Sequence, residues 1–299
     1  MTTDVLIIGS GPAGVSAALY ARRGGLDVTI VTKGIETGGL AKAEKIENYY
    51  GFAEPIEGRE LLRRGVEGAK RLGVHIVEDE LLALSFNDTF DGFKAEAKQH
   101  TFEAPAVILA AGAARRTLPV PGIKEFEGKG VSYCAVCDAF FYRGKTVAVV
   151  GSGEYALHEA QVLLPHAKKV LLLTNGEQPS VKVPAALELH TEKIAAVEGE
   201  NRVARVLFAD GQEISVDGLF LAIGTAGSTE LARKIGAFLD GSNIKTDAAQ
   251  ATNVPGLFAA GDCTGGLLQV AKAVYEGSVA GLSALRYVRD KRKAAAAKS

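Results

Sequence analysis

The sequence has few cysteines, few prolines, almost no net charge and no long hydrophobic run. Three cysteines in 299 residues are too few for the disulfide framework of a secreted scaffold, and they fit a reducing compartment. With nine prolines and no low-complexity tract, the 35 glycines indicate tight turns and not disorder. A formal net charge of −1 gives no electrostatic footprint for nucleic acid or an anionic membrane surface.

Nothing in the sequence predicts export or membrane insertion. No apolar run approaches the ~20 residues that would span a bilayer. The first nine residues lack the basic and long apolar segments of a signal peptide. We therefore expect a cytoplasmic protein. The chain is longer than the size at which a single core stops growing, so we also expect two domains.

A dinucleotide-binding pattern opens the chain. A buried-strand run, Val5–Ile8, precedes the turn Gly9-Ser10-Gly11-Pro12-Ala13-Gly14, and a helix (Val15–Arg23) and a second strand (Asp27–Thr32) come next. In such a turn glycines allow a tight bend, close approach of the backbone to a pyrophosphate, and close packing of helix on strand. The flanking strand and helix supply the context that the motif alone lacks.

The same pattern returns later in the chain. Val5–Gly11 aligns with Val147–Gly153 at an offset of 142 residues, and Gly14 aligns with Ala156. This repeat predicts an α/β protein with two Rossmann-like folds. The polar segments Arg115–Gly122 and Thr225–Thr229 are the expected crossovers between them.

Shorter patterns predict the remaining elements. We expect a basic amphipathic helix, four strands of a β-meander, three buried strands, a turn-rich segment, three further strands, and a long helix with a frayed tail. The basic helix is Pro55–Leu72, and the meander strands are Val74–Val77, Leu81–Phe86, Phe93–Ala97 and His100–Phe102. The buried strands are Ala106–Ala110, Leu219–Gly224 and Leu257–Asp262, and the turn-rich segment is Thr174–Pro184. The further strands are His190–Val197, Arg202–Phe208 and Glu213–Val216, and the long helix is Leu267–Arg289, with the frayed tail after Lys291.

Two cysteines, Cys134 and Cys137, lie directly upstream of the second strand, turn and helix. Their spacing lets the thiols close a small disulfide ring and lets each lower the pKa of the other. Beside a βαβ pattern this motif is typical of redox chemistry. A buried cysteine pair and a zinc half-site stay open as alternatives. Zinc would need two further ligands, and neither Cys263 nor any of the five histidines has ligand spacing with the pair, so we expect no metal.

Taken together, these motifs resemble the low-molecular-weight thioredoxin reductases over nearly the whole chain. The resemblance is carried by Gly9–Gly14, Gly38-Gly39, Glu47-Asn48, Ala110-Ala111-Gly112, Cys134-Ala-Val-Cys137-Asp138, Phe140–Tyr142 and Gly261-Asp262. It implies two Rossmann-like domains with three layers (ββα), the second inserted into the first. The FAD-binding domain would be residues 1–114 and 225–299, and the inserted domain bearing the cysteines would be residues 115–224. A homodimer is also implied.

The resemblance further implies the site residues. FAD would be bound by Gly9, Gly11, Pro12, Ala13, Gly14, Gly39, Leu40, Asn48, Ala111, Gly112, Gly261 and Asp262, with Asn48 by the isoalloxazine and Asp262 on the ribityl chain. The catalytic residues would be Cys134, Cys137 and Asp138, with Cys137 facing the flavin, Cys134 attacking the partner disulfide and Asp138 moving protons. Simpler interpretations stay open: Asp262 as a turn residue, Asn48 bonding its own backbone, Asp138 as a helix cap or turn carboxylate, and Cys263 as a buried filler.

One departure from the family pattern bears on the electron donor. NADPH-dependent members grip the 2′-phosphate with an arginine-rich cluster after the second strand of the inserted domain, because guanidinium forks hold phosphate oxygens in pairs. Here residues 173–178 contain neither arginine nor histidine, and Glu177 would repel a phosphate. Glu154 and Tyr155 are expected to add charge and bulk to the turn. Nor does an acidic residue directly end the strand, as NAD would prefer.

The sequence therefore favours the branch of the family that takes electrons from reduced ferredoxin, with thioredoxin or a thioredoxin-like protein as substrate. An NADPH-dependent thioredoxin reductase with an atypical site and a non-enzymatic flavoprotein redox sensor are the alternatives. The related ferredoxin–NADP oxidoreductases lack the CxxC, which argues against them. A possible ferredoxin dock is the basic helix carrying Arg59, Arg63, Arg64, Lys70 and Arg71, although a solvated helix face explains these charges as well.

Overall fold

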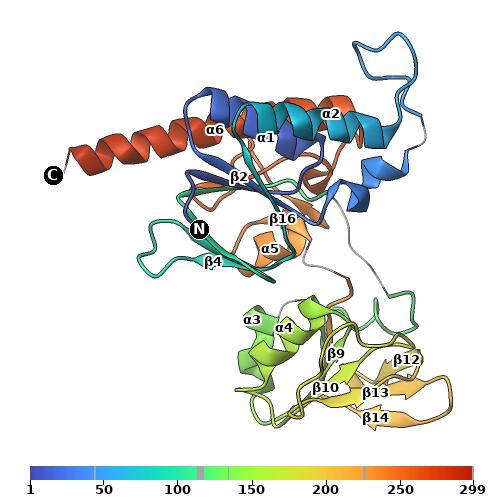
Figure 1. The fold of residues 1–299 in the computed structure, drawn as a ribbon. Coiled ribbons are helices and arrows are strands. Elements are labelled where there is room, and N and C mark those ends of the chain that lie inside the picture. The colour runs from blue at the N-terminus through green and yellow to red at the C-terminus, as the bar shows by residue number, and fades with distance from the viewer. Residues whose placement is uncertain (44, 113–117, 134, 225–226, 298–299) are drawn as a thin grey trace. The chain divides into compact units, whose positions relative to one another are not determined.

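The computed structural model describes residues 1–43, 45–112, 118–133, 135–224 and 227–297, and only the backbone of residues 42, 136 and 137. The chain divides into two compact units, Met1–Arg115 with Gly227–Ser299, and Arg116–Ala226 (Figure 1). Each unit has its own hydrophobic core. Among the described residues, no helix is long and apolar enough to cross a membrane.

The first unit is built on a parallel five-stranded sheet in the order β18-β7-β1-β2-β3. These strands are β1 (Val5–Ile8), β2 (Val28–Thr32), β3 (His75–Glu78), β7 (Ala106–Leu109) and β18 (Leu257–Ala259). Every residue of β1, β7 and β18 is buried, as expected of strands covered on both faces.

Two further layers cover this sheet. The helices α1 (Pro12–Arg23), α2 (Gly58–Arg71) and α6 (Val270–Ala296) lie on one face, and an antiparallel sheet of β4 (Leu81–Phe86), β5 (Phe93–Ala97) and β6 (Thr101–Ala104) lies on the other (Figure 1). The α1 and α6 backbones approach closely because α6 carries Gly277 and Gly281. A Cβ added at these glycines would lie 2.1 Å from Ala13 O and 2.4 Å from Ala17 O.

The smaller elements of this unit include some that the sequence did not predict. They are η1 (Ile35–Thr37), η2 (Gly39–Lys42), α5 (Ser228–Lys234), the hairpin β16 (Leu239–Asp240) and β17 (Asn243–Ile244), and η4 (Asp262–Thr264). The expected return crossover Thr225–Thr229 already contains the start of α5, at Ser228; residues 225 and 226 lie outside the described residues.

Two predictions about this unit are wrong. The first strand assigned to the meander, β3, pairs in parallel with β2, because α2 carries the chain back to the same edge of the sheet. The tail after Lys291 is helical to Ala296 and not frayed. Alanine has the highest helix propensity, and Arg292 anchors this end by an ion pair with Asp4.

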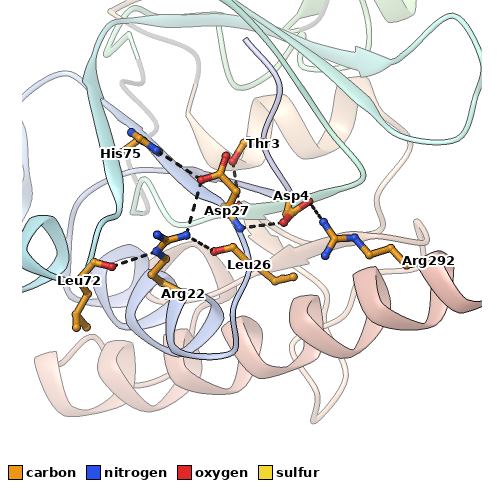
Figure 2. A network of polar contacts seen from close by, with 8 residues as sticks. All are labelled: Thr3, Asp4, Arg22, Leu26, Asp27, Leu72, His75 and Arg292. Carbon is orange, nitrogen blue, oxygen red and sulfur yellow. Dashed lines mark hydrogen bonds and ion pairs between the residues drawn. The ribbon is translucent and has the colours of Figure 1, made fainter.

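A polar network lies at the amino ends of β1, β2 and β3, the edge of the sheet opposite the turn after β1 (Figure 2). Arg22 donates to the carbonyls of Leu26, at 3.0 Å, and Leu72, at 3.1 Å. The backbone N–H of Asp27 donates to Asp4 at 2.9 Å, and Asp4 in turn pairs with Arg292. These contacts join the ends of α1 and α2 to the start of β2 and the last turns of α6.

The second unit repeats the three-layer plan. Its parallel sheet, in the order β11-β10-β9-β15-β8, is packed against the antiparallel sheet β12-β13-β14 on one face, with α3 and α4 on the other (Figure 1). The elements are β8 (Val131–Ser132), α3 (Ala135–Asp138), η3 (Ala139–Tyr142), β9 (Thr146–Val150), α4 (Glu154–Leu163), β10 (Lys169–Leu173), β11 (Glu188–His190), β12 (Ile194–Gly199), β13 (Val203–Phe208), β14 (Glu213–Ser215) and β15 (Gly218–Leu221).

The single strand predicted over His190–Val197 is two strands. β11 pairs in parallel with β10, whereas β12 pairs antiparallel with β13 in the other sheet. Between them Thr191 O accepts the Gly176 N–H at 2.9 Å as the chain changes layer. The predicted fold class, two Rossmann-like three-layer folds with the second inserted into the first, is confirmed.

Candidate active site

The turn after β1 leaves no room for side chains on its inner side. Gly9 has φ +110°, and a Cβ there would lie 2.5 Å from Ala110 O, while a Cβ at Gly14 would lie 1.9 Å from Gly9 O. A Cβ added at Gly11, in contrast, would meet nothing within 4 Å. Pro12 occupies the first turn of α1, which contains no acidic residue. Free peptide N–H groups at such a helix start attract a pyrophosphate.

The loop after β18 lies against this turn. Gly261 has φ +86°, and a Cβ there would lie 2.9 Å from the Cβ of Ala13. Two charged side chains of α6, Lys272 and Glu276, hold the loop. Lys272 Nζ donates to Gly261 O at 2.9 Å and lies 3.0 Å from a Glu276 oxygen, which accepts the Gly261 N–H at 2.8 Å. The next residue, Asp262, is therefore presented from a fixed backbone.

The end of β7 adds further open backbone. The Ala111 N–H donates to Ser228 Oγ at 3.0 Å, and a Cβ at Gly112, whose φ is +75°, would meet nothing within 4 Å. Cys263 is fully buried, its thiol lies 3.4 Å from Leu109 O and Ala260 O, and burial raises its pKa to about 12. Cys263 is thus a protonated thiol that fills the core, as predicted.

The three FAD-binding residues predicted in the loop after β2, Gly39, Leu40 and Asn48, contact different elements of the first unit. Asn48 Nδ2 donates to Oε1 of Gln269 at 3.0 Å, so the alternative that Asn48 bonds only its own backbone is wrong. Gln269 directly precedes α6, one turn before Lys272 of that helix bonds to Gly261 O. Gly39 and Leu40 lie in η2, where α2 packs so closely that a Cβ at Gly58 would lie 1.9 Å from Leu40 O.

Sequence reasoning missed the residues that support these backbones, namely Ser228, Gln269, Lys272 and Glu276. Only Lys272 and Glu276 gave a signal, because their i,i+4 spacing on a predicted helix places them together. The glycines that form the open cradle, the acid-free start of α1 and the fixed Asp262 together fit FAD. The first unit thus offers backbone for the pyrophosphate and a carboxylate for a polyol.

The catalytic prediction can be compared with the structure only in part. Cys134 and the side chain of Cys137 lie outside the described residues, whereas the Cys137 backbone lies in α3. Asp138 accepts a hydrogen bond from Ser132 Oγ at 2.6 Å. It precedes η3 but makes no capping hydrogen bond, so the alternative of a helix cap is wrong. The carboxylate next to Cys137 is therefore held by a hydroxyl of β8.

The second glycine-rich turn, after β9, is covered by the segment that comes after β10. The Ser180 N–H and hydroxyl donate to Ser152 O at 2.8 and 3.1 Å, and Ser152 Oγ donates to the Glu177 carboxylate at 2.5 Å. A Cβ at Gly153 would lie 3.5 Å from Ser180 Oγ, whereas the corresponding Gly11 faces open space.

The expected contribution of Tyr155 to this turn is wrong. Its side chain is 2% exposed, because it packs into the core of the unit, and it adds no bulk to the open side of the turn. The side chains that bond to this turn are Glu177 and Ser180. These residues lie beyond the motif, and only the charge of Glu177 was anticipated.

Comparison with known proteins agrees with this geometry. The family model described as pyridine nucleotide-disulphide oxidoreductase matches residues 3–277. Thioredoxin reductase of Bacillus subtilis (strain 168) is 35% identical over 303 residues, covering 96% of this chain and 95% of the relative. The crystal structure of the atypical thioredoxin reductase TRi from Desulfovibrio vulgaris Hildenborough has a TM-score of 0.91 and 39% identity, covering 96% of this chain and 98% of that one. A ferredoxin-flavin thioredoxin reductase from Clostridium acetobutylicum has a TM-score of 0.71 and 31% identity, covering 97% and 99%.

Two Rossmann-like units, one with an open glycine cradle and one carrying a CxxC, define a flavin-dependent disulfide oxidoreductase. FAD is the cofactor of this class. More narrowly, the chain belongs to the pyridine nucleotide-disulphide oxidoreductase family and, within it, to the low-molecular-weight thioredoxin reductase type.

Proposed function

We propose that this protein reduces thioredoxin or a thioredoxin-like protein through Cys134 and Cys137, with electrons from reduced ferredoxin and not from NADPH. The choice of ferredoxin as donor is supported by one observation: the segment after β10 lies over the glycine-rich turn after β9 in the second unit. There the Ser152 hydroxyl is bonded to Glu177, and Ser180 lies where the first unit is open.

The segment after β10 is anchored at its start, so a nucleotide could not displace it without loss of hydrogen bonds. Thr174 Oγ1 donates to Glu177 O at 2.5 Å, and the Asn175 side chain accepts the Ile194 N–H at 2.8 Å. The carboxylate that it brings to the turn opposes binding of a phosphate. The similarity to a ferredoxin-flavin thioredoxin reductase supports the same donor.

In the proposed reaction FAD would be held by the glycines of the turn after β1 and by Asp262, and it would supply electrons in pairs to the cysteines. Two electrons and two protons convert the Cys134–Cys137 disulfide to two thiols. The Cys134 thiolate then attacks the partner disulfide, forming a mixed disulfide and releasing one partner thiolate. Cys137 attacks that mixed disulfide, restoring the ring and releasing the second partner thiolate. Asp138, held by Ser132, takes and returns protons at these sulfurs.

The basic helix α2 is not proposed as the ferredoxin dock. Two of its arginines are paired with glutamates of the same helix: Arg63 with Glu60 and Glu67, and Arg64 with Glu60. Hydrogen bonds from Arg63 and Arg64 lower the pKa of Glu60 to about 2. These residues form the solvated, self-neutralised helix face that was the alternative. A homodimer and a cytoplasmic location stay predictions from the sequence.

Anaerobic reduction of thioredoxin with reduced ferredoxin, and separately with NADPH, tests the proposal. We expect turnover with ferredoxin and no bleaching of the flavin by micromolar NADPH. Turnover with NADPH would show an NADPH-dependent enzyme with an atypical site. A reducible disulfide without turnover from either donor would favour a redox sensor. Cys134→Ser and Cys137→Ser should keep FAD and lose disulfide reduction.

A further inference from the structure

The second strand of the first unit ends without a carboxylate. In Rossmann-like units an Asp or Glu about 20 residues after the glycine-rich turn accepts a hydrogen bond from the ribose of the bound dinucleotide. Here β2 ends at Thr32, whose hydroxyl lies 2.7 Å from Ser10 Oγ and accepts the Gly34 N–H at 3.2 Å. The next residue, Lys33, is basic, and its Nζ lies 3.9 Å from Glu80. A ribose bound at this edge of the sheet therefore needs an acceptor from another element.

The neighbouring strand β3 brings a carboxylate to this place. Its last residue, Glu78, is the register partner of Thr32 in the parallel sheet. The Glu78 carboxylate lies close to the backbone that leaves β2, because a Cβ added at Gly34 would be 3.1 Å from its Oε1 and 3.8 Å from its Oε2. Gly34 has φ +98°, a conformation that favours glycine, so the carboxylate lies beside backbone that carries no side chain.

Glu78 also differs from the other carboxylates near the end of β2. It is exposed, and among the described residues no hydrogen bond or ion pair engages its side chain. In contrast, Glu36 pairs with Arg59 at 3.1 Å, and Glu80 pairs with Lys33. Glu78 can therefore accept a hydrogen bond from a ligand without losing a contact within the protein.

We propose that Glu78 is a cofactor-binding residue whose carboxylate accepts a hydrogen bond from the 2′-hydroxyl of the adenosine ribose of FAD. The strand β3 thus supplies, from the adjacent position in the sheet, the acceptor that β2 lacks. A hydrogen bond to a charged acceptor is stronger than one between neutral groups, so this contact contributes to the retention of FAD. The inference depends on FAD as the cofactor and goes beyond the proposed function, since it involves neither the electron donor nor the cysteines.

Competition between FAD and adenine nucleotides tests this contact. The FAD-loaded full chain is titrated with ADP and, separately, with 2′-deoxy-ADP, and the release of FAD is followed by the rise in flavin fluorescence. We expect the wild-type protein to need about tenfold more 2′-deoxy-ADP than ADP for half release. Glu78→Ala should bring the two concentrations to within about twofold of each other. Because both nucleotides are compared in the same variant, a general loss of FAD affinity cancels from the ratio.

Two further variants make the result specific. Glu36→Ala removes the paired carboxylate that follows β2 and should keep the wild-type ratio. Glu78→Gln keeps the length and a neutral acceptor and should give an intermediate ratio, and it replaces Glu78→Ala if that variant does not retain FAD. The inference is overturned if the Glu78 variant keeps the wild-type ratio, if the wild-type protein does not distinguish the two nucleotides, or if Glu36→Ala loses the distinction instead. No donor or disulfide enters the titration, so failure of the proposed function leaves its outcome unchanged.

Discussion

The charge of Glu177 gives a quantitative test of why the second unit should not bind NADPH. Its carboxylate accepts the Ser152 hydroxyl at 2.5 Å, on the turn where a bound pyrophosphate would sit. At a separation of about 4 Å, two unit charges repel by about 1 kcal/mol in water and about 4 kcal/mol near a protein surface. Removing one charge should therefore strengthen nucleotide binding about five- to several-hundredfold.

The corresponding change is Glu177→Gln, which keeps the length and an acceptor for Ser152. Binding of NADPH is measured by calorimetry at low and high salt, with Glu200→Gln as the control for net charge. We expect binding by Glu177→Gln to be stronger than wild type but still weak, because Ser180 continues to cover Gly153. The gain should shrink as salt screens the repulsion.

Two results would refute this reasoning. Micromolar NADPH binding by the wild-type protein would show that the covered turn opens readily. Equal affinities of wild type, Glu177→Gln and Glu200→Gln would show that the carboxylate does not contribute and that Ser180 alone blocks the turn. A further loss of the Ser180 contacts, in Ser180→Gly, distinguishes these cases.

Three further predictions concern stability, cofactor retention and catalysis. Burial raises the pKa of Asp79, but the hydrogen bonds from His100 and from the Glu80 and Gln99 amides outweigh it and hold the pKa below its usual value. Asp79→Asn should therefore lower the free energy of unfolding by about 1–3 kcal/mol at pH 7. The difference between variant and wild type should fade below about pH 4, because the wild-type carboxylate is then protonated. A difference that stays the same in acid would contradict this. Glu276→Gln should weaken FAD retention about tenfold, about 1.4 kcal/mol, measured by flavin release and compared with the exposed Asp290→Asn; equal release from both would show that the ion pair does not support the loop. Asp138→Asn should slow single-turnover thioredoxin reduction about 100-fold and Ser132→Ala less; a double variant slower than Asp138→Asn would mean that Ser132 does not act through Asp138.

Much of the fold was predictable because parallel strands are short, continuous apolar runs. β1, β7 and β18 were recognised from such runs, and the repeated glycine motifs placed α1 and α4. The predictions that failed depend on partners distant in sequence. His75–Glu78 could not be assigned to a sheet from its own pattern, since pairing with β2 is decided by how α2 returns the chain. The end of α6 could not be placed without the Arg292–Asp4 contact.

The candidate site shows the same division. Glycines at close backbone contacts, such as Gly9 and Gly14, are readable because the motif itself requires them. A supporting side chain such as Ser228 cannot be recognised in this way, because the backbone N–H that it accepts belongs to Ala111, 117 residues away. Glu159 is a further case, since nothing in its own helix indicates a contact with Ala135.

The two glycine-rich turns share their first three residues, and they differ at the start of the next helix and in the segment after the second strand of each unit. Both read Gly-Ser-Gly. In the first, Ser10 Oγ lies 2.7 Å from the hydroxyl of Thr32, inside its own βαβ unit. In the second, Ser152 is bonded to Glu177, which the segment after β10 brings back over the turn. The glycines of the second turn still have a packing role, since a Cβ at Gly151 would lie 2.3 Å from Ala222 O. Under the proposed function the second unit keeps its glycine motif for packing, while α4 supports the helix that carries Cys137.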